Sequence, residues 1–427
     1  MGAKEEYSMS NYYSVHFPAE EVLRFSCLHH EEYPERREFI SVTATNVWRR
    51  YNSVRSGKEL RELAVKAGVG ASIHLGPYYD DAASRARGKG IVSKQLPFDL
   101  DLTDLSFLGV LKKDQTCNDR FSRLVFGHAH ILRSILHEVF GFEHFLPLYS
   151  GGRGVHLWVL DERANALSEE TRKGICLMMT PPKSMYDGLY NSTLMLKHPS
   201  FGNEVRMAMY DVLTRVLLAP IEEGGVGLLQ TMSDVETFMS RFFLLKKGQL
   251  TSGWHHIEIE CEMHVRREMK SLRALGKGAY NALKSIMHAG AEPQHGADKM
   301  TPQNISFKNM LSKLDDVMFT LCWPKLDEGP TTSLQHPLKI PFSEHPSTKR
   351  IALPVEKLLP ERGKPHLPPV VTGKDLNFAG PLLDRFHLSI ALMKSAVASA
   401  SPRMSPSMDI EDLAGGVARP KKAAKFK

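Results

Sequence analysis

The sequence of 427 residues predicts an α+β protein, and three observations lead to this class. Up to about residue 160, short β-like runs are mixed with helical patterns. From about residue 168 to residue 288 the pattern changes to long amphipathic helices, and between residues 321 and 370 strand-like or irregular, proline-punctuated segments return. The middle stretch therefore reads as a helical insertion in a chain that otherwise mixes strands and helices.

The same changes in pattern divide the chain. A length of 427 residues favours two structural units over one. We expect a core formed by residues 1–167 and 301–400, a helical insertion over residues 168–300, and a disordered basic tail over residues 401–427.

The elements of the first stretch follow from local patterns. The runs FISV near Phe39 and IHLGPYY near Ile73 have strand character. The segment FSRLVFGHAHILRSILHEVF has helical apolar spacing and stops at Gly141, a residue type favoured just after helices. The segment LPLYSGGRGVHLWVLDE reads strand, glycine turn, strand, which predicts a hairpin.

The later elements are mainly helical. NEVRMAMYDVLTRVLLAP, SDVETFMSRFFLLKK with Ser233 as N-cap, and a run after His256 each predict a helix of the insertion. One more apolar helix is predicted from Pro381 to Ala398. The chain shows no internal repeat.

Composition limits the class of protein. No run approaches the roughly 18 apolar residues of a membrane-spanning helix, and the N-terminus lacks the pattern of a signal peptide, so we expect a soluble intracellular protein. Five scattered cysteines without a C-x-x-C pair indicate reduced thiols. The net charge of +7 favours a polyanionic partner without requiring one, and part of it lies in the tail.

The segment LPFDLDLTD, residues 96–104, carries acids on an apolar strand pattern. Asp99 and Asp101 lie two positions apart, so their side chains point the same way from backbones about 6.6 Å apart. They either converge on one or two divalent cations or face water from an edge strand. The same letters also match the D-x-D-x-T signature of haloacid-dehalogenase-like phosphatases, for which Asp315 and Asp316 could supply the later acidic pair.

Further along, the chain offers ligands for phosphate. The segment YSGGRGVHLWV places Ser150, Arg153 and His156 around three glycines, which is typical of an anion site or of an ordinary hairpin turn. No G-K-[ST] follows, so it is not a P-loop. Together with the acids, four later side chains complete a set suited to metal ions and a triphosphate: Asp327, His336, Lys339 and His345.

In this order along the chain, these pieces resemble the catalytic small subunit of eukaryotic and archaeal DNA primases. The matching segments are NYYSVHFP, RREF, WRRYNS, LPFDLDLTD, FGFEHFLPLYSGGRGVHLWVLDE, PKLD, LQHPLKIPFSEHPSTKR and IALPV. They cover most of residues 10–175 and 320–356. The S-G-x-R-G-x-H and K-x-P-F-x-x-H-P elements are more specific than the acid strand, and they favour the primase over the phosphatase.

The resemblance implies a mixed β-sheet with flanking helices as the catalytic core and an inserted helical subdomain. Carried over by position, Asp99, Asp101 and Asp327 hold two Mg²⁺ or Mn²⁺ ions, and His336 lies near the ribose. Arg50 matches an arginine of the nucleotide site. The triphosphate is bound by Ser150, Arg153, His156, Lys339 and His345.

The implied activity is synthesis of short RNA primers on a single-stranded DNA template from nucleoside triphosphates by two-metal phosphoryl transfer. Two alternatives stay open: a primase-polymerase of repair or organelle replication that uses deoxynucleotides, and a non-catalytic paralogue that binds DNA or a partner. The implied partners are a large subunit with an iron–sulfur cluster and the replicative DNA polymerase alpha complex, with no membrane. The expected compartment is the nucleus, with the mitochondrion as the alternative.

The chain also departs from the family pattern. Gly152 stands where a second arginine is common, and Ser72 and His74 stand where eukaryotic subunits usually carry a lysine and an aspartate. Of the family's four clustered zinc ligands only Cys117 remains, and the nearby His128 and His130 read as ordinary helical side chains. Zinc is therefore not expected.

Overall fold

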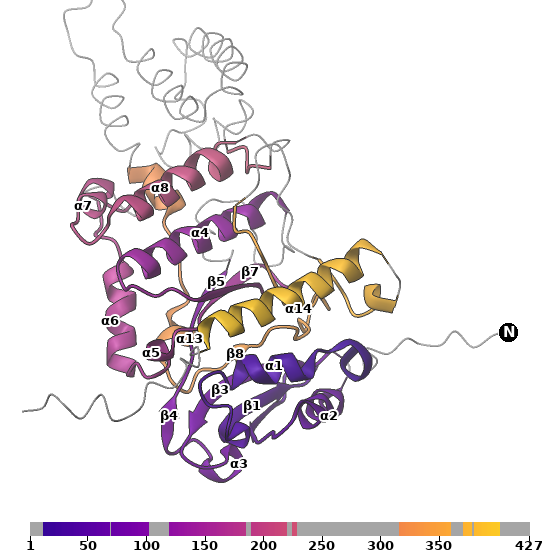
Figure 1. Ribbon diagram of the computed structural model, residues 1–427. Helices are drawn as coiled ribbons and strands as arrows, with labels where there is room; N and C mark the ends of the chain where they lie inside the picture. The colour runs from indigo at the N-terminus through magenta and orange to yellow at the C-terminus, as the bar shows by residue number, and fades with distance from the viewer. Residues whose placement is uncertain are drawn as a thin grey trace, which may run out of the picture.

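The computed structural model describes residues 12–68, 70–101, 119–184, 189–219, 224–228, 316–359, 370–377 and 380–401. These residues form helices and antiparallel sheets, which confirms the α+β class (Figure 1). Several expectations concern residues that are not described: the part of the helical insertion that follows residue 228, the basic tail from residue 402, Cys117 and Asp315.

The first sheet comes mainly from the N-terminal part of the chain. Its strands run in the order β2 (Trp48–Asn52), β1 (Arg37–Val42), β3 (Ser72–Tyr79) and β4 (Ile91–Ser93), and the short β8 (Leu338–Lys339) pairs with β3. Phe39, Ile73 and Leu75 are buried in one hydrophobic cluster with α1 (Ala19–Ser26) and α2 (Gly57–Ala67). Figure 1 shows both helices beside this sheet. The strands expected near Phe39 and Ile73 are confirmed.

The second sheet has the order β5 (Leu96–Asp101), β7 (Gly154–Val159), β6 (Phe145–Tyr149) and β9 (Leu353–Pro354). The strands β6 and β7 form the predicted hairpin. Along β7, Val155 and Leu157 join the cluster that holds α4, whereas Trp158 joins the cluster of the first sheet. This alternation buries the second sheet on both faces, which is why an imidazole at position 156 is buried as well.

The long helices lie where the patterns predict them. α4 (Asp119–Glu138) covers the second sheet, and Gly141 follows it with a φ of +66° and an N–H that donates to the His137 carbonyl (2.9 Å). α6 (Glu169–Met179) starts after Ser168, whose hydroxyl accepts from the Thr171 N–H. α14 (Pro381–Ala400) confirms the apolar helix.

The remaining elements are shorter. α8 (Asn203–Asp211) continues into a π-helical turn, η4 (Val212–Leu217), so the first helix expected in the insertion is confirmed. The others are η1 (Tyr12–His16), η2 (Pro34–Arg36), α3 (Ala83–Ala86), α5 (Glu162–Asn165), α7 (Ser192–Leu196), α13 (Glu328–Thr332) and η6 (Asp375–Asn377). None of the helices in the described ranges is long and apolar enough to cross a membrane.

The described residues between 321 and 370 contain little strand and much irregular chain, in agreement with the strand-like or irregular expectation. Residues 316–322 are helical, and β8 and β9 have two residues each. Val317 and Leu321 are fully buried in the cluster around α4, so tertiary packing favours a helix there. Apart from these elements and α13 (Glu328–Thr332), the described residues of this segment form turns, isolated bridges and irregular chain.

Candidate active site

The acids of β5 lie on the more exposed face of a buried strand. Leu96, Phe98 and Leu100 are at most 1% exposed, whereas the side chains of Asp99 and Asp101 are 23% and 36% exposed. In the antiparallel pairing of β5 with β7, Asp99 lies opposite His156 and Asp101 lies opposite Gly154, which follows Arg153 of the glycine turn. His156 Nε2 is 3.6 Å from Asp99 Oδ1, and Arg153 Nε is 3.7 Å from Asp101 Oδ1. The positive charge that faces the two acids therefore comes from outside β5, which carries no basic residue: Arg153 lies beside Asp101, and Lys339 interacts electrostatically with Asp99.

Asp327 reaches the same place from a distant part of the chain. Its backbone N–H donates to the Asp99 carbonyl oxygen (3.0 Å), and the two residues form a β-bridge at the edge of β5. Asp327 is also the N-cap of α13, because its Oδ1 accepts from the Gly329 N–H (3.0 Å). The three acids named from the sequence are thus brought together by main-chain pairing.

The donor set suits a hard divalent cation, because Mg²⁺ and Mn²⁺ prefer carboxylate oxygens. In the described part of the chain, no three acidic, histidine or cysteine side chains already converge on a common metal position. Asp327 Oδ1 instead accepts a backbone bond, and Asp101 faces Arg153. A cation at this site would replace these contacts of the two carboxylates.

The glycine turn is held internally and by its neighbours. Ser150 Oγ accepts from the backbone N–H groups of Gly152 and Gly154 (both 3.2 Å). Gly151 has a φ of +76°, and a Cβ on it would lie 2.7 Å from the Arg350 carbonyl oxygen. The turn therefore uses its glycines for close packing against other parts of the chain.

The departure at Gly152 has a structural counterpart. A Cβ at this position would lie 2.6 Å from His345 Nε2, so the His345 ring occupies the space that a side chain at position 152 would need. His345 in turn is fixed by bonds that its Nδ1 makes with Ser347 Oγ (3.1 Å) and the Thr348 N–H (3.3 Å). The exchange of an arginine for glycine thus coincides with a close approach of His345 to the turn.

Lys339 is the buried cation between the two sheets. It lies on β8 opposite His74 of β3, and it is 6% exposed. Burial lowers the pKa of Lys339 to about 7, against the opposite effect of the Asp99 charge. Burial, followed by the charge of Lys339, likewise lowers the pKa of His156 well below its usual value, and that of His345 to about 3. Near pH 7 these imidazoles are neutral and can serve as hydrogen-bond donors, while part of the Lys339 population carries charge.

Ser72 and His74, the second departure from the family pattern, form a small polar group beside Lys339. Ser72 Oγ lies 2.9 Å from His74 Nε2, and the ring of the half-exposed Trp48 lies against His74 with 5.2 Å between centroids. Burial and the Lys339 charge lower the pKa of His74 to about 3. In this protein the position usually held by a lysine and an aspartate is therefore uncharged.

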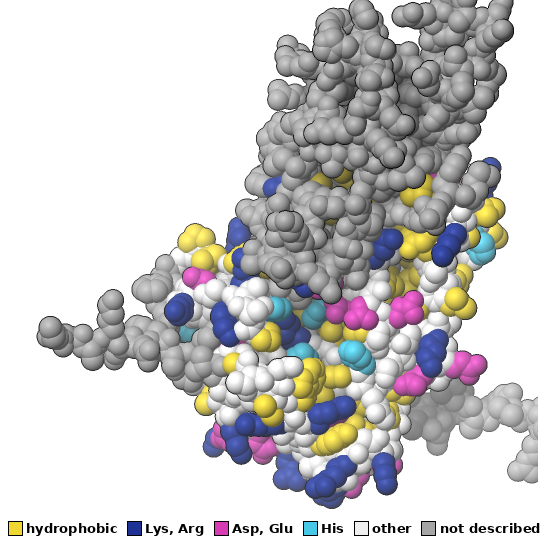
Figure 2. Space-filling model, turned by 180° about the vertical axis from the view of Figure 1, so that it is seen from behind, with side chains coloured by type: hydrophobic (Ala, Val, Ile, Leu, Met, Phe, Trp, Pro, Cys, Tyr) yellow, Lys and Arg dark blue, Asp and Glu magenta, His cyan; other side chains and the backbone are white. Residues whose placement is uncertain are grey.

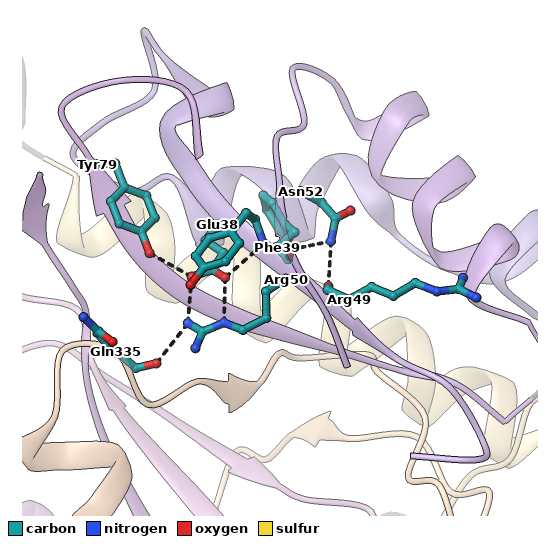
Figure 3. A network of polar contacts seen from close by, with 8 residues as sticks. Glu38, Phe39, Arg49, Arg50, Asn52, Tyr79 and Gln335 are labelled. Carbon is teal, nitrogen blue, oxygen red and sulfur yellow. Dashed lines mark hydrogen bonds and ion pairs between the residues drawn. The ribbon is translucent and has the colours of Figure 1, made fainter. Parts of the chain in front are cut away.

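Arg50 is held in a network that sequence reasoning missed (Figure 3). The fully buried carboxylate of Glu38 accepts from Arg50 Nε (2.9 Å) and Nη2 (3.1 Å), and also from the Tyr51 N–H and the Tyr79 hydroxyl. The Arg50 Nη2 group also donates to the Gln335 carbonyl oxygen (3.2 Å). The signal for Glu38 was present in RREF, where one acid begins an apolar strand, but the sequence did not indicate its partner.

His336 lies beside the acids. A Cβ on Gly329 would lie 3.2 Å from His336 Nδ1 and 3.3 Å from Asp327 Oδ1, so all three residues adjoin one another. Burial, followed by the Lys94 charge, lowers the pKa of His336. Figure 2 shows histidine, acidic and basic side chains close together on one face of the described residues. The structure thus gathers the residues named from the sequence at the junction of the two sheets.

Two other expectations concern residues outside this group. Asp316 accepts from the Ser184 hydroxyl (2.6 Å) and from Ser192, so its carboxylate is occupied away from β5, and Asp315 is not described. His128 is 1% exposed, and its Nε2 lies 2.9 Å from the Leu321 carbonyl oxygen. Asp316 and His128 therefore stabilise the fold away from the acids of β5.

Comparison with known proteins agrees with this geometry. A family model described as DNA primase small subunit matches residues 98–356. The DNA primase small subunit of Schizosaccharomyces pombe is 24% identical over 373 residues, which covers 83% of this chain and 74% of the relative. That of Saccharomyces cerevisiae is 25% identical over 374 residues, covering 83% and 82%. The DNA primase small subunit PriS of Haloarcula marismortui is 34% identical over 106 residues, covering 23% and 25%.

The family match spans the acid strand, the glycine turn, Asp327 and the Lys339 to His345 segment, which are the parts that meet at the junction of the two sheets. It extends over more than half of the chain. The resemblance noted from short motifs is therefore confirmed, and this protein belongs to the DNA primase small subunit family.

Proposed function

We propose that this chain is the catalytic subunit of a primase and that it synthesises short RNA primers on single-stranded DNA. The observation that carries the proposal is the β-bridge between Asp99 and Asp327, because it brings acids from two distant segments to one edge, facing Lys339 and His156. Acidic groups beside basic ones are what transfer of a nucleotide from a triphosphate requires.

In this proposal Asp99, Asp101 and Asp327 hold two Mg²⁺ or Mn²⁺ ions. When bound, the ions supply activation of the primer 3′-hydroxyl and neutralisation of the departing pyrophosphate. His336 adjoins Asp327 and is assigned to the ribose, and Arg50 is assigned to the nucleotide through its position beside Gln335. The triphosphate is assigned to Ser150, Arg153, His156, Lys339 and His345.

The proposed partners follow from the family. They are a large subunit with an iron–sulfur cluster and the DNA polymerase alpha complex, and the proposed compartment is the nucleus, with the mitochondrion as the alternative. Binding of single-stranded DNA by a chain of net charge +7 should weaken steeply with salt.

The test is primer synthesis by the purified chain on single-stranded DNA with Mg²⁺ or Mn²⁺, with labelled ribonucleotides in one arm and deoxynucleotides in the other. We expect short RNA, and we expect Asp99→Ala with Asp101→Ala to abolish it. A matched control is Asp161→Ala, because among the described residues Asp161 accepts only backbone bonds, from Glu143 and His144.

Ribonucleotide incorporation that persists in the double variant contradicts the assignment of the acids. A preference for deoxynucleotides would support the primase-polymerase instead. No product from the unmutated chain, even with a large subunit added, would indicate a non-catalytic paralogue.

A further inference from the structure

Two buried cations lie behind the site and belong to none of the assignments above. Lys94 is 3% exposed and Arg172 is fully buried. In the described residues neither forms an ion pair with a carboxylate, and every hydrogen bond they donate goes to a main-chain carbonyl oxygen. Burying a charge without a direct ion pair is costly, and the Glu169 carboxylate acts on both cations only from beyond ion-pair distance. The main-chain groups to which the two cations bond therefore need an explanation.

Lys94 bonds to the C-terminal end of α13. Its Nζ donates to the carbonyl oxygens of Pro330 (2.6 Å) and Ser333 (2.7 Å). Carbonyl groups at the end of a helical turn have no partner within it, and a cation is a favourable one. Lys94 itself lies between β4 and β5, at the point where the chain passes from the first sheet to the second.

Arg172 joins the same elements from α6. Its guanidinium donates to the carbonyl oxygens of Lys94 and Gln95 in the link between the sheets, and Nη1 also lies 3.5 Å from the Thr331 carbonyl oxygen in α13. Two neighbouring contacts also join α13 and the residues after it to β5 and α6. The Thr331 hydroxyl donates to the Pro97 carbonyl oxygen of β5 (2.8 Å), and the Leu334 N–H donates to Glu169 on α6 (2.8 Å).

Lys94 and Arg172 thus hold the segment of residues 327–336, which carries the part of the site that lies on no long helix or strand. Residues 327–336 begin with Asp327 and end with His336, and between them lies only the short helix α13. Asp327 is joined to β5 at an isolated β-bridge with Asp99, and no longer strand pairing supports it there. The carbonyl oxygen of the adjoining Gln335 accepts a hydrogen bond from Arg50 of the first sheet. Displacement of α13 would therefore move an assigned metal ligand and an assigned ribose contact together.

We infer that Lys94 and Arg172 are positioning residues, which fix residues 327–336 between the two sheets so that Asp327 binds metal together with Asp99 and Asp101. The inference rests on the proposed function, since it takes Asp327 as a metal ligand. Neither cation touches the nucleotide. Groups that orient a metal ligand without binding the metal typically change metal affinity by about 10- to 100-fold when they are mutated.

The experiment measures Mn²⁺ binding to the full chain by electron paramagnetic resonance of free Mn²⁺, without nucleotide and then with a nucleoside triphosphate, whose own binding of Mn²⁺ is measured in the absence of protein and subtracted. The same preparations are assayed for the Mn²⁺ concentration that gives half-maximal primer synthesis and for the melting temperature. The variants are Lys94→Met, Arg172→Met and Arg172→Lys, which keeps the charge but not the fork of donors.

Two variants on α6 serve as controls. Lys173→Met removes an exposed positive charge next to Arg172, and Ile175→Ala opens a cavity in the buried face of the same helix. We expect Lys94→Met to raise the Kd for Mn²⁺ at least about tenfold, with excess Mn²⁺ restoring much of kcat. Ile175→Ala should lower the melting temperature and leave this Kd unchanged. Lys173→Met should change neither.

The possible outcomes distinguish failure of the positioning role from failure of the proposed function. If the unmutated chain binds Mn²⁺ and Lys94→Met binds it within twofold of the same Kd, the positioning role is refuted while the proposed function stands. If the unmutated chain does not bind Mn²⁺, the metal site fails and the inference fails with it. Should Lys94→Met or Arg172→Met not fold, Arg172→Lys decides, because a Kd unchanged in that folded variant also refutes the role.

Discussion

The carboxylate of Glu38 should couple energetically to Arg50, and Glu38→Gln is the change that tests this. Glutamine has nearly the same shape, so the variant leaves no cavity. The Glu38 carboxylate accepts four hydrogen bonds, two of them from the Arg50 guanidinium. Replacement of one oxygen by NH₂ removes one acceptor from Arg50 and one from Tyr79.

The magnitude follows from these bonds. Both lost bonds go to the charged carboxylate, and a hydrogen bond to a charged group contributes about 1.5–3 kcal/mol, so the lower end of this range applied to two bonds gives the expected change. The free energy of unfolding should therefore fall by about 3 kcal/mol in Glu38→Gln. Arg50→Met should cost a similar amount, because it leaves a buried carboxylate without its cation. The double variant should cost less than the sum, with a coupling energy of about 2 kcal/mol.

Urea denaturation of the full chain measures each free energy of unfolding, and the KM for ribonucleotides reports the position of Arg50. Glu62→Gln, an exposed change on α2, is the matched control and should alter stability by less than about 0.5 kcal/mol. A coupling energy below about 0.5 kcal/mol, or a KM that is the same in Glu38→Gln as in Glu62→Gln, would refute the view that Glu38 holds Arg50 for the nucleotide.

Two further predictions concern pH. Because burial lowers the pKa of Lys339 to about 7, the free enzyme loses this charge as pH rises above 7, so kcat/KM for ribonucleotides should decline from about pH 7. Lys339→Arg should remove this decline, and a profile unchanged in that variant would exclude Lys339 as its source. Burial raises the pKa of Glu344 to about 8, so the folded state binds more protons than the unfolded state between about pH 4.5 and 8, and stability should fall across that window. Neither carboxylate oxygen of Glu344 has a hydrogen-bond partner among the described residues. Glu344→Gln should therefore flatten the decline of the free energy of unfolding between pH 5 and 8, measured by denaturation. If this free energy falls equally steeply with pH in both proteins, Glu344 is not the source of the decline.

Much of the site could be named from the sequence because its residues lie in regular local patterns. The alternation of LPFDLD predicts a strand with both acids on one side, and β5 has that form. YSGGRGVH predicts a hairpin turn with a serine, an arginine and a histidine, and the structure places Arg153 and His156 beside the acids while Ser150 holds the turn. These features depend on spacings of two residues, which the backbone fixes by itself.

Other features depend on contacts between distant segments. Glu38 and Arg50 are both visible in the sequence, but only the antiparallel pairing of β1 with β2 makes them partners. Lys94 and Arg172 carry no local signal, since their acceptors are carbonyl oxygens that every residue possesses. Leu321 and Cys322 end a helix where the sequence indicated strand-like or irregular chain, because both are buried in the cluster around α4, and this burial decides their form.

The sequence by itself therefore determined the α+β class, the family and most of the side chains that we assign to metal and nucleotide. The tertiary structure alone decided that Asp327 pairs with Asp99, that His345 fills the space beside Gly152, and that buried cations hold α13 against β5. The physical reason is that residue type and spacing are local properties, whereas burial, pKa and partnership arise only when segments far apart in the chain come into contact.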